Sequence, residues 1–240
     1  ESLVPRVKQN RTKFSANILA TESIARGRNF LEAHRDALES AETIYGVPKE
    51  EIVAVIRVES NLGKYLGNLG VWNVFYTRLI TSPEDKWQWD AANLTALGKY
   101  CYTAKVDCFS IKGSNAGAFG VVQFLPYSVE EWGVDGTGDG IVNLFDMKDS
   151  IPSAANFLKE HGWEDDQPGA LASYYGNGKT YPAAVLGYAD ALRESSPDDL
   201  RLGTGNQRET SPVMGKVSAF ATYVTVKFYC LFSSTPYCQD

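Results

Sequence analysis

The sequence predicts a mainly α-helical fold with little β structure. Two observations indicate this: apolar residues recur at helical spacing, and glycine or proline stands at the ends of the periodic segments. The chain has 240 residues and 44% hydrophobic content, enough for one sizeable core or two small ones. Helices are expected over residues 21–45, 48–63, 71–80, 83–100, 149–161 and 181–193, with a further helix ending near 174.

Residues 1–194 are expected to form one domain, whose first part (1–20) is an arm without clear periodicity. Residues 195–212 are rich in Ser, Pro, Asp and Gly, which is typical of a linker or long loop. Residues 213–232 fit the period of a helix and that of a strand, and a helix is preferred. The segment 195–240 is therefore interpreted as a linker and a C-terminal extension.

The net charge of −6 and the pI near 5.1 argue against a nucleic-acid-binding protein. The first 35 residues carry seven Lys or Arg against three Asp or Glu, which confines any basic patch to the arm. The most apolar stretch, 213–232, is interrupted by Lys216 and Lys227, so no membrane span is expected. The chain starts at Glu1 without a signal peptide, as expected for an exported protein that has lost its leader.

The four cysteines form two close pairs, Cys101/Cys108 and Cys230/Cys238. The absence of a CxxC motif and the presence of only two histidines disfavour a zinc site. Two local disulfides would suit an oxidising compartment. Other pairings, or four reduced cysteines in a cytosolic protein, remain open.

Glu59 is the strongest candidate for a catalytic residue. Ile52, Val55, Ile56 and Glu59 share one helix face, which is apolar except for its last member. A carboxylate beside buried aliphatic side chains at a helix C-terminus is expected to have a raised pKa, as a general acid requires. The alternative is a glutamate that reaches solvent at the helix end.

Residues 65–102 are rich in aromatic side chains, which suits a core or a carbohydrate groove. The glycine-rich stretch 112–126 contains Gln123, an amide able to bind a ligand or to hold the loop. Tyr174 and Tyr181 flank another glycine-rich connection and are either groove residues or half-buried core tyrosines.

The most specific local pattern lies between Asp135 and Asp149. Oxygen-bearing side chains occupy positions 1, 3, 5 and 9 of a calcium-loop pattern, and glycine occupies position 6. Position 12 holds Asp146 where the bidentate Glu is usual, and an ion-free Asp/Gly turn is the alternative. The candidate ligands of a structural calcium or sodium ion are Asp135, Thr137, Asp139, Ile141 through its carbonyl, and Asp149.

Four pieces of the chain, in this order, resemble the lysozyme-like lytic transglycosylases, specifically the membrane-bound lytic transglycosylase B family. The resemblance covers residues 28–194. The pieces are Val58–Ser60; Ala116–Gly120 with Gln123–Pro126; Asp135–Asp149 with Ser153–Leu158 and His161–Trp163; and Ser173–Tyr174.

This resemblance implies a lysozyme-like helical fold over 1–194 with an EF-hand-like loop longer than usual, closed by Asp149. It implies that Glu59 is the catalytic acid. Two departures are Tyr175, where the family usually has asparagine, and the reduced set of arginines after the catalytic helix. The implied substrate-binding residues are Ser114, Gln123, Tyr174 and Tyr181, with Arg78 as the nearest candidate arginine.

The implied reaction is cleavage of the β-1,4 bond between N-acetylmuramic acid and N-acetylglucosamine, giving 1,6-anhydromuramoyl products. Ordinary glycosidases need a second carboxylate, and none stands out in this sequence. The alternatives are a hydrolytic muramidase on the same scaffold and a non-catalytic, calcium-dependent cell-wall binding module. The resemblance further implies a monomer in the periplasm or cell envelope, with peptidoglycan as partner and no organic cofactor.

Overall fold

The computed structural model describes residues 18–81, 87–174 and 180–194. Helices fill most of these ranges, as predicted, and each of the two strands has only two residues. In chain order the elements are α2 (Thr21–Ala33), α3 (Arg35–Tyr45), α4 (Lys49–Ser60), β1 (Leu69–Gly70), α5 (Val71–Thr81), α6 (Trp87–Ala104), η1 (Cys108–Ser110), β2 (Lys112–Gly113), α7 (Pro126–Trp132), α8 (Met147–Glu160), α9 (Gln167–Tyr174) and α10 (Thr180–Arg193).

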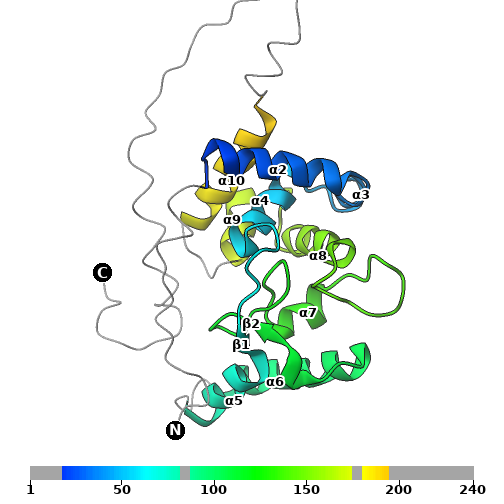
Figure 1. Cartoon of the computed structure of the whole chain (residues 1–240), viewed down its shortest axis with the longest axis vertical. Helices are drawn as coiled ribbons and strands as arrows, with labels where there is room; N and C mark the ends of the chain where they lie inside the picture. Colours follow the sequence, from blue (N-terminus) through cyan, green and yellow to red (C-terminus); the bar gives the residue numbers. More distant parts are fainter. Residues whose placement is uncertain (1–17, 82–86, 175–179, 195–240) are drawn as a thin grey trace, which may run out of the picture.

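Helix α4 is the centre of the arrangement. It packs against α2, α3, α8 and α10, while α5 and α6 form the opposite end of the molecule beside the β1–β2 ladder (Figure 1). Gly46, with φ of 70°, ends α3, and Pro48 immediately precedes α4. The sequence predicted that one face of this helix is buried. In the structure all five residues from Ile52 to Ile56 are fully buried, so the buried surface extends around more of the helix than predicted. Neighbours on several sides cover this helix.

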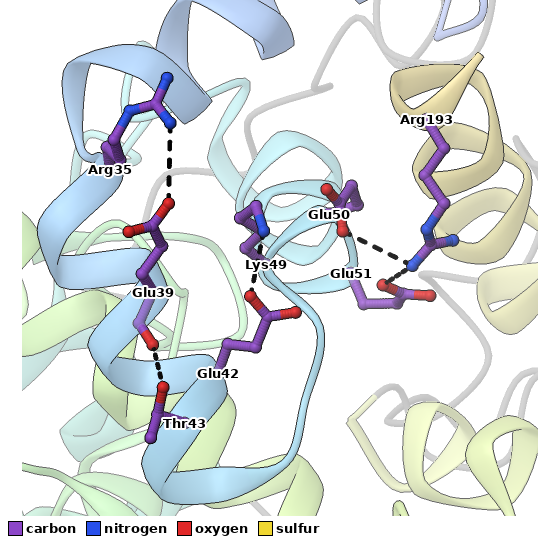
Figure 2. Close-up of polar contacts among 8 residues, drawn as sticks. All are labelled: Arg35, Glu39, Glu42, Thr43, Lys49, Glu50, Glu51 and Arg193. Atoms are coloured by element: carbon purple, nitrogen blue, oxygen red, sulfur yellow. Dashed lines mark hydrogen bonds and ion pairs between the residues drawn. The ribbon is translucent and has the colours of Figure 1, made fainter.

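Ion pairs join the start of α4 to its neighbours. Arg193 near the end of α10 pairs with Glu51 and lies 3.7 Å from Glu50, as Figure 2 shows. Lys49 pairs with Glu42 of α3 at 3.1 Å. These contacts hold α3 and α10 against the N-terminal end of α4.

The short ladder brings two glycine-containing segments into close contact. Leu69 pairs with Gly113, and Gly70 pairs with Lys112. A Cβ atom at Gly67, where φ is 86°, would lie 2.0 Å from the carbonyl carbon of Gly113. The chain therefore requires glycine at position 67, and the 112–120 loop is held close to the segment that follows α4.

Two sequence expectations need correction. The helix expected over 21–45 is two helices, because His34 leaves helical geometry with φ of −121° and ψ of 25°. The expected start of the next helix at 83 lies outside the described residues, and α6 is described from Trp87. Helix α7 was not predicted, although Pro126 suits its first position.

The disulfide predicted between Cys101 and Cys108 is confirmed, with a Cα–Cα distance of 5.5 Å. Cys230, Cys238 and the helix expected over 213–232 lie outside the described residues. Among the helices that the structure describes, none has the length and apolar character needed to cross a membrane.

Candidate active site

Glu59 lies in the last turn of α4. The residue is partly buried, and its Oε1 atom is inaccessible to solvent and without a hydrogen-bond partner in the described ranges. Burial raises the pKa of the Glu59 carboxyl from 4.5 to about 8, while a hydrogen-bonding interaction with Tyr181 opposes the shift. The predicted rise in pKa is thus confirmed, and the carboxyl is protonated at neutral pH.

Tyr174 and Tyr181 lie on the side of α4 that carries Glu59. Their rings stack with centroids 5.9 Å apart, and the Tyr174 hydroxyl donates to the carbonyl of Val122 at 2.8 Å. Burial, and then the charge of Glu59, raise the pKa of Tyr174 well above its ordinary value. The two tyrosines therefore belong to the environment of Glu59, from the end of α9 and the start of α10.

The 114–123 loop reaches the same region through Val122. Gln123 has φ of 50°, and its Nε2 donates to Gly120 at 2.8 Å and to Leu66 at 3.3 Å. The amide thus holds the loop, and no described residue donates to its oxygen. Ser114 Oγ accepts from the Ala118 amide at 3.1 Å, which leaves the Ser114 hydroxyl proton available.

The turn after Glu59 contains polar groups that sequence reasoning missed. Asn61, Leu62 and Gly63 have consecutive positive φ values of 53°, 60° and 81°. Ser60 Oγ stabilises this turn by accepting from the Gly63 amide at 2.9 Å. Asn61 Oδ1 is buried without a hydrogen-bond partner in the described part of the chain. The sequence signal for these groups was the pair of polar residues, Ser60 and Asn61, that follows the glutamate at the end of the helix.

Arg78 lies in α5. Its Nε donates to Asp90 of α6 at 2.7 Å, and the Asp90 side chain is fully buried. The Arg78 guanidinium lies 5.1 Å from the Trp89 ring and 5.8 Å from the Phe75 ring. The structure thus gives Arg78 a role in joining α5 to α6, and its role in substrate binding stays a prediction.

The carboxylates of the predicted metal loop accept hydrogen bonds from the loop backbone. Asp149 is 1% exposed; its Oδ1 accepts from Gly136 and Thr137, and its Oδ2 accepts from Asn143 at 2.7 Å. Asp135 accepts from Thr137, Gly138, Asp139 and Gly140. Hydrogen bonds, that from the Gly140 amide foremost, lower the pKa of Asp135.

The donor set of this loop fits a hard cation. Asp135, Asp139 and Asp149 offer carboxylates, Thr137 a hydroxyl and Ile141 a carbonyl, which are the oxygen ligands that calcium prefers. In the described ranges, no three His, Cys, Asp or Glu side chains converge closely enough to hold a metal. Asp146 instead caps α8, with its side chain accepting from the Lys148 amide at 2.8 Å.

The fold is mainly helical, and its candidate site combines a glutamate of raised pKa with two tyrosines. Residues 3–211 match the family model described as the transglycosylase SLT domain, and the chain belongs to this family. The match extends beyond residue 194, the predicted end of the domain.

Several known proteins are similar to this chain. Membrane-bound lytic murein transglycosylase B of Escherichia coli K12 is 33% identical over 162 residues, which are 67% of this chain and 45% of that protein. The chain therefore spans less than half of that relative. The Escherichia coli lytic transglycosylase Slt35 in complex with bulgecin A is 25% identical, with 76% of each chain covered and a TM-score of 0.69. The predicted lysozyme-like fold is confirmed.

Slt35 has also been solved in complex with calcium, with 24% identity, 76% of each chain covered and a TM-score of 0.69. SltB3 of Pseudomonas aeruginosa, in complex with NAG-anhNAM-pentapeptide, is 29% identical. That match has a TM-score of 0.58 and covers 64% of this chain and 40% of SltB3.

Proposed function

We propose that this protein is a peptidoglycan lytic transglycosylase in which Glu59 is the single catalytic acid and base. The supporting observation is the raised pKa of the Glu59 carboxyl. Burial raises this pKa to about 8, so the carboxyl carries its proton at neutral pH. No other carboxylate of the described residues is among the causes of this shift, in keeping with a mechanism that uses one carboxyl instead of the usual two. Family membership supports the substrate class.

In the proposed reaction, protonated Glu59 donates its proton to the glycosidic oxygen, and the bond from that oxygen to C1 of N-acetylmuramic acid breaks. The substrate's own N-acetyl oxygen bonds to C1. The 6-hydroxyl then displaces it, and the Glu59 carboxylate accepts the hydroxyl proton. No water is consumed, and Glu59 returns to its protonated form. Tyr181 positions the carboxyl, and the Ser114 and Gln123 side chains bind the glycan.

The products of sacculus digestion test this function. Muropeptides lighter by one water than the hydrolytic products are expected in the mass spectrum, and digestion in ¹⁸O-labelled water should leave their new ends unlabelled. Labelled, heavier ends would identify a hydrolytic muramidase. Sacculi that bind the protein without being cleaved would identify a non-catalytic binding module.

The 135–149 loop is proposed to bind calcium and to stabilise the domain. Calcium at about ten times its dissociation constant is expected to raise the melting temperature by about 3–6 °C. Asp139→Ala should remove this increment, because it deletes a ligand without changing the core. Asp165→Ala, an exposed residue outside the loop, is the matched control and should retain it. A rise in melting temperature that survives Asp139→Ala would exclude the loop as the calcium site. The same measurement with sodium in place of calcium tests which ion the loop binds.

Export to the periplasm or cell envelope is also proposed. The Cys101–Cys108 disulfide supports an oxidising compartment. The Escherichia coli relative is named as membrane-bound, and SltB3 was solved with a peptidoglycan fragment. Peptidoglycan glycan strands are the proposed partner, and the monomeric state stays a prediction.

A further inference from the structure

Two arginines, Arg26 and Arg57, lie away from the Glu59 site, where α2, α4 and α10 pack together. Arg57 and Glu59 leave α4 in nearly opposite directions, because two residues turn an α-helix by about 200°. Arg57 Nε donates to Ser23 Oγ of α2 at 2.9 Å, and its guanidinium lies 5.9 Å from the ring centre of Tyr188 on α10. Arg57 is only 6% exposed, so its charge is largely withdrawn from water.

No carboxylate of the described residues compensates this charge, although Tyr188 interacts favourably with it. The Tyr188 hydroxyl is neutral and donates to the Ser23 carbonyl at 2.6 Å. Arg26 lies one turn after Ser23 in α2 and adds a second guanidinium. Its Nε is buried and has no hydrogen-bond partner in the described ranges. Burial lowers the pKa of Arg57, Tyr188 opposes this shift, and the charge of Arg26 adds to it. Neither arginine pairs with a carboxylate of the described residues.

Two adjacent guanidinium groups without a counter-ion are costly when desolvated. The neutral oxygens of Ser23 and Tyr188 interact with Arg57, and both arginines keep further N–H donors. We propose that Arg26 and Arg57 form an anion-binding site that takes a carboxylate or a phosphate group. A planar guanidinium binds either group through two parallel hydrogen bonds. The Ser23 hydroxyl has its proton left to donate to the same anion.

The packing around this site restricts its ligand to a small group that enters from the Arg26 side. Arg26 is partly exposed, whereas Tyr188 is fully buried. A Cβ atom at Gly27 would lie 2.4 Å from the Tyr188 hydroxyl oxygen, so α2 and α10 are in close contact here. Because Arg26 lies on α2 and Arg57 on α4, an anion bound by both should stabilise the packing of these helices. The site lies apart from Glu59 and does not depend on the proposed glycan cleavage.

Thermal unfolding of the full chain with inorganic phosphate or sodium acetate, at constant ionic strength, tests the site. A saturable rise in melting temperature of about 3–6 °C at about ten times the dissociation constant is expected with at least one anion. A rise with phosphate alone identifies a phosphate site, and a rise with acetate identifies a carboxylate site. Arg26→Gln should abolish the rise, whereas Arg35→Gln, which changes an exposed arginine of α3, should retain it.

A second measurement separates ligand loss from misfolding. The ³¹P line of phosphate should broaden with the native protein and with Arg35→Gln, and should stay narrow with Arg26→Gln. Arg26→Lys keeps the charge but not the planar fork, and should restore part of the broadening or of the acetate response. No saturable response to either anion, or one that Arg26→Gln retains, would overturn the proposal. Glycan cleavage is measured separately, so failure here leaves the proposed function intact.

Discussion

Glu59→Gln is expected to reduce glycan cleavage by at least about 10³-fold, because in the proposed mechanism this one carboxyl performs both proton transfers. Glutamine has nearly the same shape as the protonated side chain and cannot release or accept the proton. Release of soluble muropeptides from sacculi measures the rate. The native rate should also fall above pH 8, as the Glu59 carboxyl with its pKa of about 8 loses its proton.

Glu160→Gln is the matched control, since it makes the same change at an exposed glutamate at the end of α8. It should cleave at the native rate. Native circular dichroism and cooperative unfolding of Glu59→Gln show that any loss of activity is chemical. A folded Glu59→Gln variant that retains full activity contradicts the assignment of the catalytic acid.

The same substitution is expected to change the pH dependence of stability. The pKa of the Glu59 carboxyl is about 8 in the folded protein against an ordinary value of 4.5, so the folded state binds this proton more tightly. The resulting stabilisation is complete below pH 4.5 and is lost as the pH rises through 8. The difference corresponds to at most ~5 kcal/mol.

Urea unfolding of native protein and Glu59→Gln between pH 5 and 9 measures this effect. The native free energy of unfolding should fall with pH relative to that of the variant, and the variant should be the more stable one at pH 9. Subtracting the two curves removes the contributions of other groups. Parallel curves across this range would mean that the Glu59 carboxyl has an ordinary pKa.

Local sequence patterns predicted much of the helical structure and the character of Glu59. The spacing of Ile52, Val55 and Ile56 placed the glutamate beside apolar side chains at a helix end, and the structure has it there. The closeness of Tyr174 and Tyr181 to Glu59 depended on the resemblance, since no local pattern relates α4 to residues more than a hundred positions later.

Features that arise from tertiary packing were not predictable. Helix α7 is only seven residues long, too short for a clear helical period. The break at His34 interrupts a continuous pattern without a glycine or proline to mark it. The Arg26–Arg57 pair has no local signal either, because its importance comes from tertiary packing that leaves both arginines without a carboxylate partner among the described residues.

Because α10 packs against α4, the environment that raises the pKa of Glu59 is complete only after α10 has been synthesised. Glu59 belongs to an early helix, whereas Tyr181 and much of the cover of α4 come from Thr180–Arg193. Before α10 is synthesised and packed, the Glu59 carboxyl is expected to be hydrated and ionised at neutral pH. A nascent or truncated chain that lacks α10 is therefore expected to lack the proposed activity.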